Sequence, residues 1–224
     1  MAQFPANIDL SSLDGSNGFK LSGAAANDYS GRSVASAGDV NGDGFADVIV
    51  GAAHGSSPYA DRSGASYVVF GKASGFAADL DLSSLDGSDG FKLGGEAATD
   101  RSGWSVDSAD DVNGDGFADL IIGAVGARPH GINSGASYVV FGKASGFAPN
   151  LDQSSLDGGN GFKLSGVAAR DYSGWSVASA GDVNGDGFAD VIVGAFRASP
   201  HGAYSGASYV VFGKACPKTA ECQA

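Results

Sequence analysis

The stretch DVNGDGFADVIVGA, residues 39–52, decides the fold because it occurs three times in the chain. It returns with two conservative changes at 111–124 and word for word at 182–195. Two further motifs keep the same spacing of 71 or 72 residues: GFKL, which begins at 18, 90 and 161, and SGASYVVFGKA, which begins at 63, 134 and 205. A fixed period of this kind indicates repeats of one structural unit.

The length and composition fit a folded repeat protein. The 224 residues are 43% hydrophobic and 17% charged, which is too apolar and too weakly charged for a disordered chain. We predict three repeats and a tail, at about 1–72, 73–143, 144–215 and 216–224. The tail holds Cys216 and Cys222 outside any metal-binding pattern, so the pair could close a small disulfide loop, cross-link two chains or stay reduced.

The net charge of −12 and the pI near 4.3 argue against nucleic acid and anionic membrane surfaces as partners, since both require basic patches. No apolar run approaches the roughly 20 residues of a membrane span, so we expect no membrane insertion. The opening MAQFPANIDL lacks the basic and apolar regions of a signal peptide. Many acidic residues fall within the three repeated loops, where they would repel one another unless a cation lay among them.

Each repeat has the pattern of short β-strands. In the first repeat the apolar or alternating runs are 32–40, 46–52 and 65–72, with a weaker one at 18–23. They are rich in Val, Ile, Tyr and Phe and are separated by Gly, Asp, Asn and Ser, and no segment shows a sustained helical period. The connection at 12–19 holds Asp-Gly and Asn-Gly, which favour the primed turns of hairpins. The predicted fold class is therefore all-β.

Four short antiparallel strands, repeated radially, make a blade of a β-propeller. We therefore predict propeller blades, three repeats per chain. The chain opens with the segment that would be the fourth, outer strand of a blade, and the last repeat ends with its third strand. This offset is the one by which propellers close, because the first strand of the chain completes the last blade.

The acidic loop has the pattern of a metal site. With Asp39 as position 1, the oxygen-bearing residues Asn41, Asp43 and Asp47 stand at positions 3, 5 and 9, and Phe45 at position 7 offers its backbone carbonyl. Hard oxygen ligands in this number suit Ca²⁺, whereas Mg²⁺ demands a stricter octahedron and Zn²⁺ prefers Cys or His.

Two rival interpretations of the loop were weighed. An EF-hand needs a bidentate Glu at position 12, where this chain has Val50, Ile122 and Val193, and its flanks are helical rather than strand-like. A plain acidic turn without metal is common for one copy. Three copies with every oxygen ligand in place favour the metal site.

The loop followed by GASYVVFGK resembles the FG-GAP repeat of integrin α-subunit propellers and of many bacterial surface proteins. The resemblance covers residues 1–215 and includes the Phe-Gly that closes each repeat. It implies a calcium loop between the first two strands of each blade, with about one Ca²⁺ per repeat and three per chain. The implied ligands are Asp39, Asn41, Asp43, Phe45, Asp47, Asp111, Asn113, Asp115, Phe117, Asp119, Asp182, Asn184, Asp186, Phe188 and Asp190.

The sequence departs from the family pattern in three places. The Gly-Ala-Pro that ends the second strand is replaced by GAA, GAV and GAF. Asp110 stands where the other repeats have Gly38 and Gly181, which is expected to alter that loop's charge or turn. Integrin propellers have seven blades, whereas this chain supplies three.

Three blades cannot surround a channel without extreme strand geometry, since closed propellers carry about 4–8. We therefore expect self-association, with a homodimeric six-bladed ring favoured over a head-to-tail filament. A third interpretation is that the chain is a piece of a longer protein. Unpaired edges at both ends would otherwise favour aggregation.

The sequence holds no phosphate loop, no nucleophile–base pair and no cofactor motif, so we expect no enzyme activity. The function we expect is that of a calcium-binding module with a structural, adhesion or self-assembly role, extracellular or at the cell surface. One alternative is a calcium-dependent lectin that stacks a glycan on Trp104 or Trp175. Another is a non-catalytic domain of a larger secreted enzyme. A protein or glycan ligand is a further candidate partner.

Overall fold

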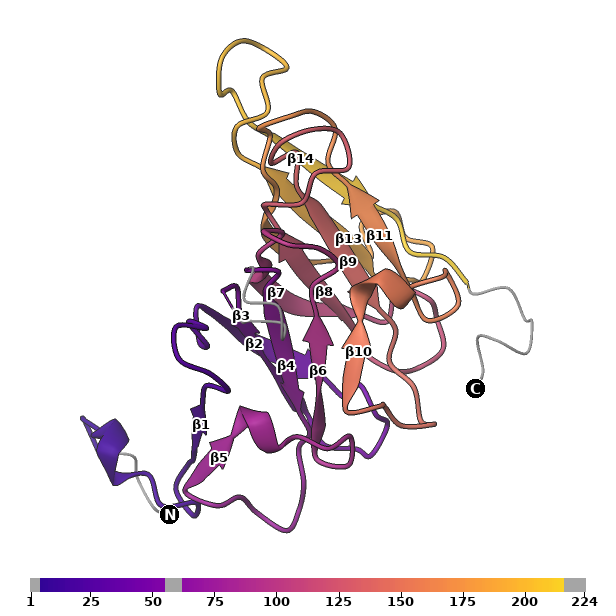
Figure 1. Ribbon diagram of the computed structural model, residues 1–224. Helices are drawn as coiled ribbons and strands as arrows, with labels where there is room; N and C mark the ends of the chain where they lie inside the picture. Colours follow the sequence, from indigo (N-terminus) through magenta and orange to yellow (C-terminus); the bar gives the residue numbers. More distant parts are fainter. Residues whose placement is uncertain (1–4, 55–61, 216–224) are drawn as a thin grey trace.

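The computed structural model describes residues 5–54 and 62–215, which form short strands linked by turns (Figure 1). The strands from the first repeat are β1 (Lys20–Ser22), β2 (Ser33–Gly38), β3 (Asp47–Ala52) and β4 (Ala65–Val69). Those from the second are β5 (Asp79–Asp81), β6 (Gly90–Gly94), β7 (Ser102–Asp110), β8 (Asp119–Ala124) and β9 (Ala136–Val140). Those from the third are β10 (Asn150–Asp152), β11 (Gly161–Ser165), β12 (Ser173–Gly181), β13 (Asp190–Ala195) and β14 (Ala207–Val211). Three 3₁₀ turns occur within these residues, η1 (Leu10–Ser12), η2 (Leu82–Ser84) and η3 (Gln153–Ser155).

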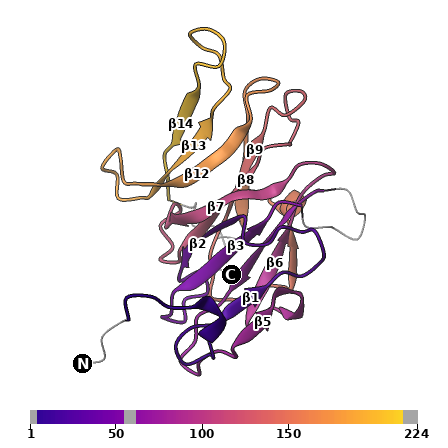
Figure 2. The same cartoon turned by 90° about the vertical axis from the view of Figure 1, so that its left-hand side faces the viewer.

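The strands form three propeller-type blades, which confirms the predicted fold class. Blade 1 has the antiparallel order β2-β3-β4-β6, and blade 2 has the order β7-β8-β9-β11. Blade 3 has three strands, β12, β13 and β14. Each of the first two blades takes its fourth strand from the following repeat, as the sequence offset predicts. The blades stack as an open arc and do not close into a ring (Figures 1 and 2).

The hydrophobic core lies between neighbouring blades. Ile49 and Val68 of blade 1 share one cluster with Val106 and Ile122 of blade 2, and a second cluster joins blade 2 to blade 3. The blades approach so closely that a Cβ added at Gly51 would lie 2.3 Å from the backbone oxygen of the facing blade. Glycine at the end of the apolar run therefore permits this contact.

Two short strands were not predicted from the sequence. Residues of β5 pair in parallel with β1, and those of β10 pair in parallel with β6. A 3₁₀ turn follows each of them and is capped by an aspartate, so that Asp81 Oδ1 accepts a hydrogen bond from Ser83 N at 2.8 Å. The connection between the third and fourth strands of blades 1 and 2 is thus ordered by pairing with β1 or with β6, the outer strand of blade 1.

The segment 12–19 forms the predicted turn-rich connection, but it does not join two strands of a hairpin. η1 precedes this turn and β1 follows it, and β1 pairs with β5 rather than with the preceding segment. The equivalent turn in the second repeat separates β5 from β6, which pair with different strands. Asp-Gly and Asn-Gly set a tight turn here, but tertiary pairing decides the partners.

Candidate metal centres

The three acidic loops each connect the first and second strands of a blade, where the family resemblance places them. Each loop follows β2, β7 or β12 and leads into β3, β8 or β13. Gly42 and Gly44 adopt φ of +73° and +87°, the left-handed region that bends the chain sharply. The loop can therefore close around its own first residue.

The carboxylate at position 1 lies inside the loop and accepts backbone hydrogen bonds. Asp39 Oδ1 accepts from Gly42 N at 2.7 Å and Asp43 N at 3.1 Å, and its Oδ2 accepts from Gly44 N at 2.9 Å. Asp111 and Asp182 make the same three contacts in their own loops. These contacts hold each loop in one shape and fix the position of the first carboxylate.

Positions 3 and 5 are linked to each other. Asn41 Nδ2 donates to Asp43 Oδ2 at 3.0 Å, and Asn41 Oδ1 accepts from Asp43 N at 3.0 Å. Asp43 Oδ1 accepts from Phe45 N at 2.8 Å. The same bonds recur in the other two loops, so the predicted ligands at 1, 3 and 5 lie in one turn of chain.

The carboxylate at position 9 is buried and joins the loop to the end of the third strand. Asp47 Oδ2 accepts from Val40 N at 2.9 Å, and its Oδ1 accepts from Gly71 N at 2.8 Å. A Cβ at Gly71 would lie 2.4 Å from the backbone oxygen of Ala46, so only glycine fits beside the loop. Asp119 and Asp190 make the equivalent pair of bonds. This role of the Phe-Gly motif was not predicted from the sequence, although the constant distance of the motif from the loop was the available signal.

Burial dominates the electrostatics at position 9. Burial, with a smaller contribution from the carboxylates of Asp43 and Asp39, raises the pKa of Asp47 to about 6, although two backbone hydrogen bonds lower it. The pKa of Asp119, which is more deeply buried, is raised to about 8 by the same causes. In the first two loops negative charge at position 9 is thus costly without a cation.

Phe at position 7 packs against the neighbouring loop, a contact that sequence reasoning did not predict. A Cβ at Gly42 would lie 2.3 Å from Cε1 of Phe117, and a Cβ at Gly114 would lie 2.3 Å from Cε1 of Phe188. The ring of each loop therefore covers the glycine of the loop before it. Phe45, in the first loop, is largely exposed.

Asp110 keeps the turn that glycine makes in the other repeats. Its φ is +53°, against +73° for Gly38 and +66° for Gly181. Aspartate tolerates this left-handed conformation better than most residues. Its side chain accepts a hydrogen bond from Ser179 Oγ of the next blade, so the substitution adds a contact between blades and leaves the turn in place.

The donor set of each loop fits a hard cation. It offers three carboxylates, an amide oxygen and a backbone carbonyl, which are oxygen ligands that suit Ca²⁺. As placed, the carboxylates turn toward backbone N–H groups, and no three His, Cys, Asp or Glu side chains in 5–54 and 62–215 lie close enough together to hold a metal ion. The ion pairs described for this part of the chain, Lys20–Asp79 and Lys163–Glu96, lie outside the loops.

The two tryptophans stack on one another along the arc. The guanidinium of Arg32 lies 3.4 Å from the ring centroid of Trp104, and the centroids of Trp104 and Trp175 are 4.8 Å apart. Phe196 continues the row at 4.3 Å from Trp175. This stacking gives both tryptophans a packing role, and Trp175 stays 39% exposed.

In the part of the chain that the structure describes, no helix is long and apolar enough to cross a membrane.

The sequence profile of the FG-GAP repeat matches residues 30–69, 102–140 and 173–211, which is more than half of the chain.

Three relatives illustrate the similarity. Integrin alpha-4 of Xenopus laevis is 30% identical over 178 residues, which cover 80% of this chain and 15% of that protein. Integrin alpha-IIb of Mus musculus is 31% identical over 188 residues, with 83% and 16% covered. Phosphatidylinositol-glycan-specific phospholipase D of Bos taurus is 32% identical over 186 residues, with 76% and 20% covered. The chain spans a fifth or less of each of these relatives. With three matched repeats that coincide with its three blades, the chain belongs to the FG-GAP repeat family.

Proposed function

We propose that this chain is a calcium-binding propeller module with a structural or adhesive role, extracellular or at the cell surface. The observation that carries the proposal is the buried carboxylate at position 9 of every loop. Asp47, Asp119 and Asp190 are each at most 1% exposed and share a loop with two further carboxylates. None of the ion pairs described in the chain reaches these loops. Buried charges in proteins are normally paired or bound to metal.

An ion would act mainly on the stability of the blades. The carboxylate at position 1 is already held in place by three backbone N–H groups. The oxygens at positions 3, 5 and 9 also accept hydrogen bonds from backbone amides, so these side chains would have to turn from the amides toward a bound ion. Three Ca²⁺ ions would change the formal net charge from −12 to −6. Because each loop connects two strands of a blade, the ion would fix the turn from which the second strand starts.

We further propose that the chain itself is not catalytic and serves as one module of a larger protein. The support is that integrins and a phospholipase D match the same repeat region, although that region is a fifth or less of each relative. A module found in relatives with such different names carries no single chemistry. A non-catalytic part of a larger enzyme is therefore the second candidate.

Calcium binding can be measured directly by isothermal titration and by melting. We expect three Ca²⁺ ions per chain. Extracellular calcium modules bind at about 10⁻⁴–10⁻³ M, so about 5 mM calcium would stabilise the chain by about 1–2 kcal/mol per loop. Each kcal/mol shifts the melting temperature of a chain of this size by about 2–4 °C. A melting curve that is the same in calcium and in EGTA would contradict the proposal.

A matched pair of variants separates the loops from the general acidity of the surface. Asp186→Asn removes one charge from the third loop and keeps an oxygen for Phe188 N. We expect it to lower the stoichiometry from three ions to two. Asp86→Asn removes the same charge from a turn outside the loops, where Oδ1 accepts from Ser88 N, and should leave three ions bound. Equal loss of binding in both variants would indicate non-specific screening.

A further inference from the structure

Apolar residues are exposed at the two ends of the arc, although the equivalent residues of the other repeats are buried between blades. Val106 and Val177 lie on the first strands of blades 2 and 3 and are 5% and 6% exposed, because the preceding blade covers them. Val34 holds the same place in blade 1 and is 65% exposed. We call this uncovered side of blade 1, with Val34 and Phe45, the head face.

The opposite end of the arc shows the complementary gap. Val40 and Val112 are covered by the following blade, whereas Val183 in blade 3 is 60% exposed. Gly185 has no atom within 4 Å of an added Cβ, although a phenylalanine ring covers the equivalent glycine in the other two loops. We call this side of blade 3, with Val183 and Gly185, the tail face. At the head face Phe45 thus lacks a preceding loop whose glycine its ring could cover. At the tail face Gly185 lacks a phenylalanine ring from a following loop.

The free edge of blade 3 repeats this pattern. Its third strand, β14, has no fourth strand among the described residues, whereas β4 and β9 are each paired by one. Tyr138 on β9 is fully buried, and Tyr209, the equivalent residue on β14, is 36% exposed. The edge therefore presents both unpaired backbone groups and apolar side chains, which is the usual template for strand addition.

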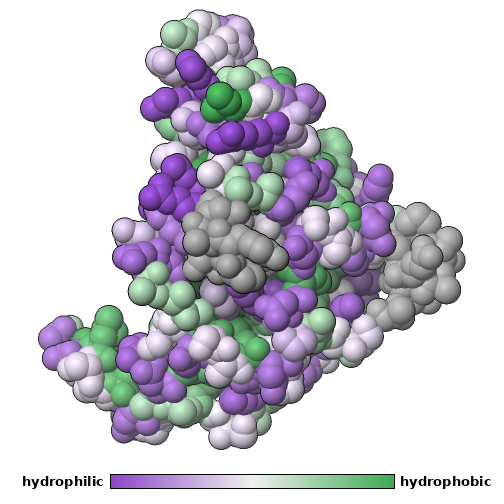
Figure 3. Space-filling view, in the orientation of Figure 1, coloured by the Kyte–Doolittle hydropathy of each residue, from purple (hydrophilic) through white to green (hydrophobic). Residues whose placement is uncertain are grey.

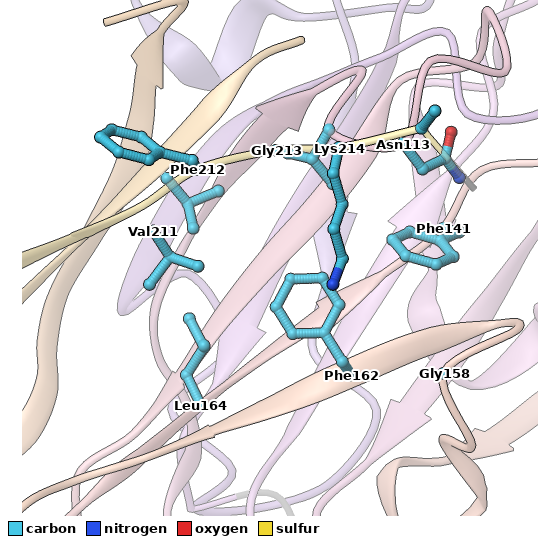
Figure 4. A pocket seen from close by; sticks show the side chains of 12 residues that line it. Asn113, Phe141, Gly158, Phe162, Leu164, Val211, Phe212, Gly213 and Lys214 are labelled. Carbon is cyan, nitrogen blue, oxygen red and sulfur yellow. The ribbon is translucent and has the colours of Figure 1, made fainter. Parts of the chain in front are cut away.

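A groove of about 390 Å³ lies beside this edge, between β11 and β14 (Figure 4). Phe141, Phe162 and Leu164 line one part of it, and Val211 and Lys214 line another. In the close-up, Lys214 extends across the groove toward Phe162, and Phe212 points away from it. The lining is mainly apolar and fits an aromatic side chain.

Equivalent grooves in the chain show what fills this place. The ring of Phe91 on β6 stacks on Phe147 at 4.1 Å between centroids, and that of Phe19 stacks on Phe76 at 4.0 Å. In both cases the second ring comes from the connection that follows the third strand of a blade, β9 or β4, and that connection then adds β10 beside β6 or β5 beside β1. After blade 3 the SGFA motif that supplies this ring is replaced by CPKT at 216–219.

The chain carries one more segment of this kind, at its own beginning. Residues 4–22, FPANIDLSSLDGSNGFKLS, correspond position by position to 76–94 and to 147–165. One side chain of the segment lacks the burial of its counterpart, since Leu10 is 78% exposed whereas Leu82 is 1% exposed. Hydrophobic atoms show on this protruding segment at the lower left of Figure 3. β1 and β14 lie at opposite ends of the molecule, so the segment does not reach blade 3 of its own chain (Figures 1 and 2).

We propose that a second copy of this chain docks its residues 5–22 and its head face onto the free edge, the groove and the tail face of blade 3, as each repeat docks onto the one before it. The partner's β1 then becomes the fourth strand of blade 3. The inference rests on packing and does not depend on calcium binding. A second copy is the occupant because the chain carries both complementary surfaces, one at each end of the arc. The same kind of contact already occurs twice within the chain, between blades 1 and 2 and between blades 2 and 3.

The proposal fixes the register of the new strand pair. Lys92 lies opposite Tyr67 in blade 1, and Lys163 lies opposite Tyr138 in blade 2. The Lys163 amino group also lies 5.4 Å from the ring centroid of Tyr138, so these two side chains share a face. Lys20 of the second copy must therefore lie opposite Tyr209.

Light scattering of the whole chain in millimolar calcium tests the association. We expect a mass of two chains, or a larger multiple if the arc continues without closing. Leu10→Glu should weaken association about tenfold or more, because an apolar contact is replaced by a charge. Ile132→Glu changes an exposed apolar residue in a loop of blade 2 and should leave the mass unchanged. A single-chain mass at about 100 μM, or equal weakening by both variants, would overturn the proposal.

Cross-linking tests the register. Two proteins are mixed, both with Cys216→Ser and Cys222→Ser, one bearing Lys20→Cys and the other Tyr209→Cys. Directly opposite residues have Cβ atoms about 4.5–5.5 Å apart, so mild oxidation should give a covalent pair of chains. Val210→Cys in place of Tyr209→Cys points to the other face of the strand and should give little product. The reverse preference, or no product from either mixture, would refute the strand pairing.

Discussion

Replacing Gly114 by alanine tests the contact between neighbouring loops against a control that the chain itself provides. Gly114 and Gly185 hold the same position in the second and third loops, with φ of +75° and +77°. An added Cβ at Gly114 would lie 2.3 Å from Cε1 of Phe188, whereas at Gly185 nothing lies within 4 Å. The two substitutions therefore share the backbone strain and differ in packing.

The expected magnitudes follow from these two causes. Alanine in the left-handed region costs about 1–2 kcal/mol at either position. Forcing a methyl group into the Phe188 ring adds about 1–3 kcal/mol at Gly114 alone. Gly114→Ala should therefore melt about 2–12 °C below Gly185→Ala.

Thermal melting followed by circular dichroism, at about 1 μM protein and in millimolar calcium, is the assay. Gly42→Ala should behave like Gly114→Ala, because Phe117 covers Gly42 at the same 2.3 Å. Removing the ring in a Gly114→Ala, Phe188→Ala double variant should cost less than the two single changes added together. Equal melting temperatures for Gly114→Ala and Gly185→Ala would refute the packing of the loops on one another.

Two further predictions concern single positions. Burial raises the pKa of Asp100 to about 6, above its ordinary 3.8, so the folded chain binds a proton more tightly and loses stability as the pH rises from 4 to 6. Asp100→Asn removes the titrating group and therefore this loss. In urea titrations, its unfolding free energy relative to that of the parent chain should rise by about 3 kcal/mol between pH 4 and pH 7. A difference that stays constant with pH would contradict this prediction. Gly71→Ala would place a Cβ 2.4 Å from the Ala46 oxygen and should destabilise the chain by at least about 1–3 kcal/mol. In Gly94→Ala the added Cβ meets the Leu151 oxygen at 3.9 Å, an ordinary contact, so this variant should cost less than about 1 kcal/mol in the same titration.

The strands that carry blade cores could be predicted because each is apolar and bounded by turn residues. The run at 46–52 was predicted as a strand and forms β3, Asp47–Ala52, and the run at 65–72 contains β4, Ala65–Val69. β5 and β10 could not be predicted in this way, since each has three residues and pairs in parallel with a strand distant in the sequence, β1 or β6. Their order comes from a neighbour that local sequence does not reveal.

The loop residues were predicted as a set, but their individual contacts depend on the fold. The spacing of Asp39, Asn41 and Asp43 predicts that their oxygens share one turn, and they do. The spacing does not say that Asp47 reaches Gly71 N, because that amide belongs to a strand 24 residues later. Phe45 was predicted to contribute only its carbonyl, yet its counterparts pack their rings on the preceding loop.

The near-identity of the repeats makes the remaining differences informative. Val40, Val112 and Val183 have the same sequence neighbours, and their burial differs because only the first two have a following blade. Burial of a valine side chain contributes about 1.5–3 kcal/mol, so covering Val34 and Val183 would each add a stabilising free energy of about this size. Association of two chains that covers the head face of one and the tail face of the other would bury both valines. It would also add backbone hydrogen bonds along β14. The mass of the chain in solution therefore reports whether a second copy recovers the free energy that each repeat already gains from its neighbour.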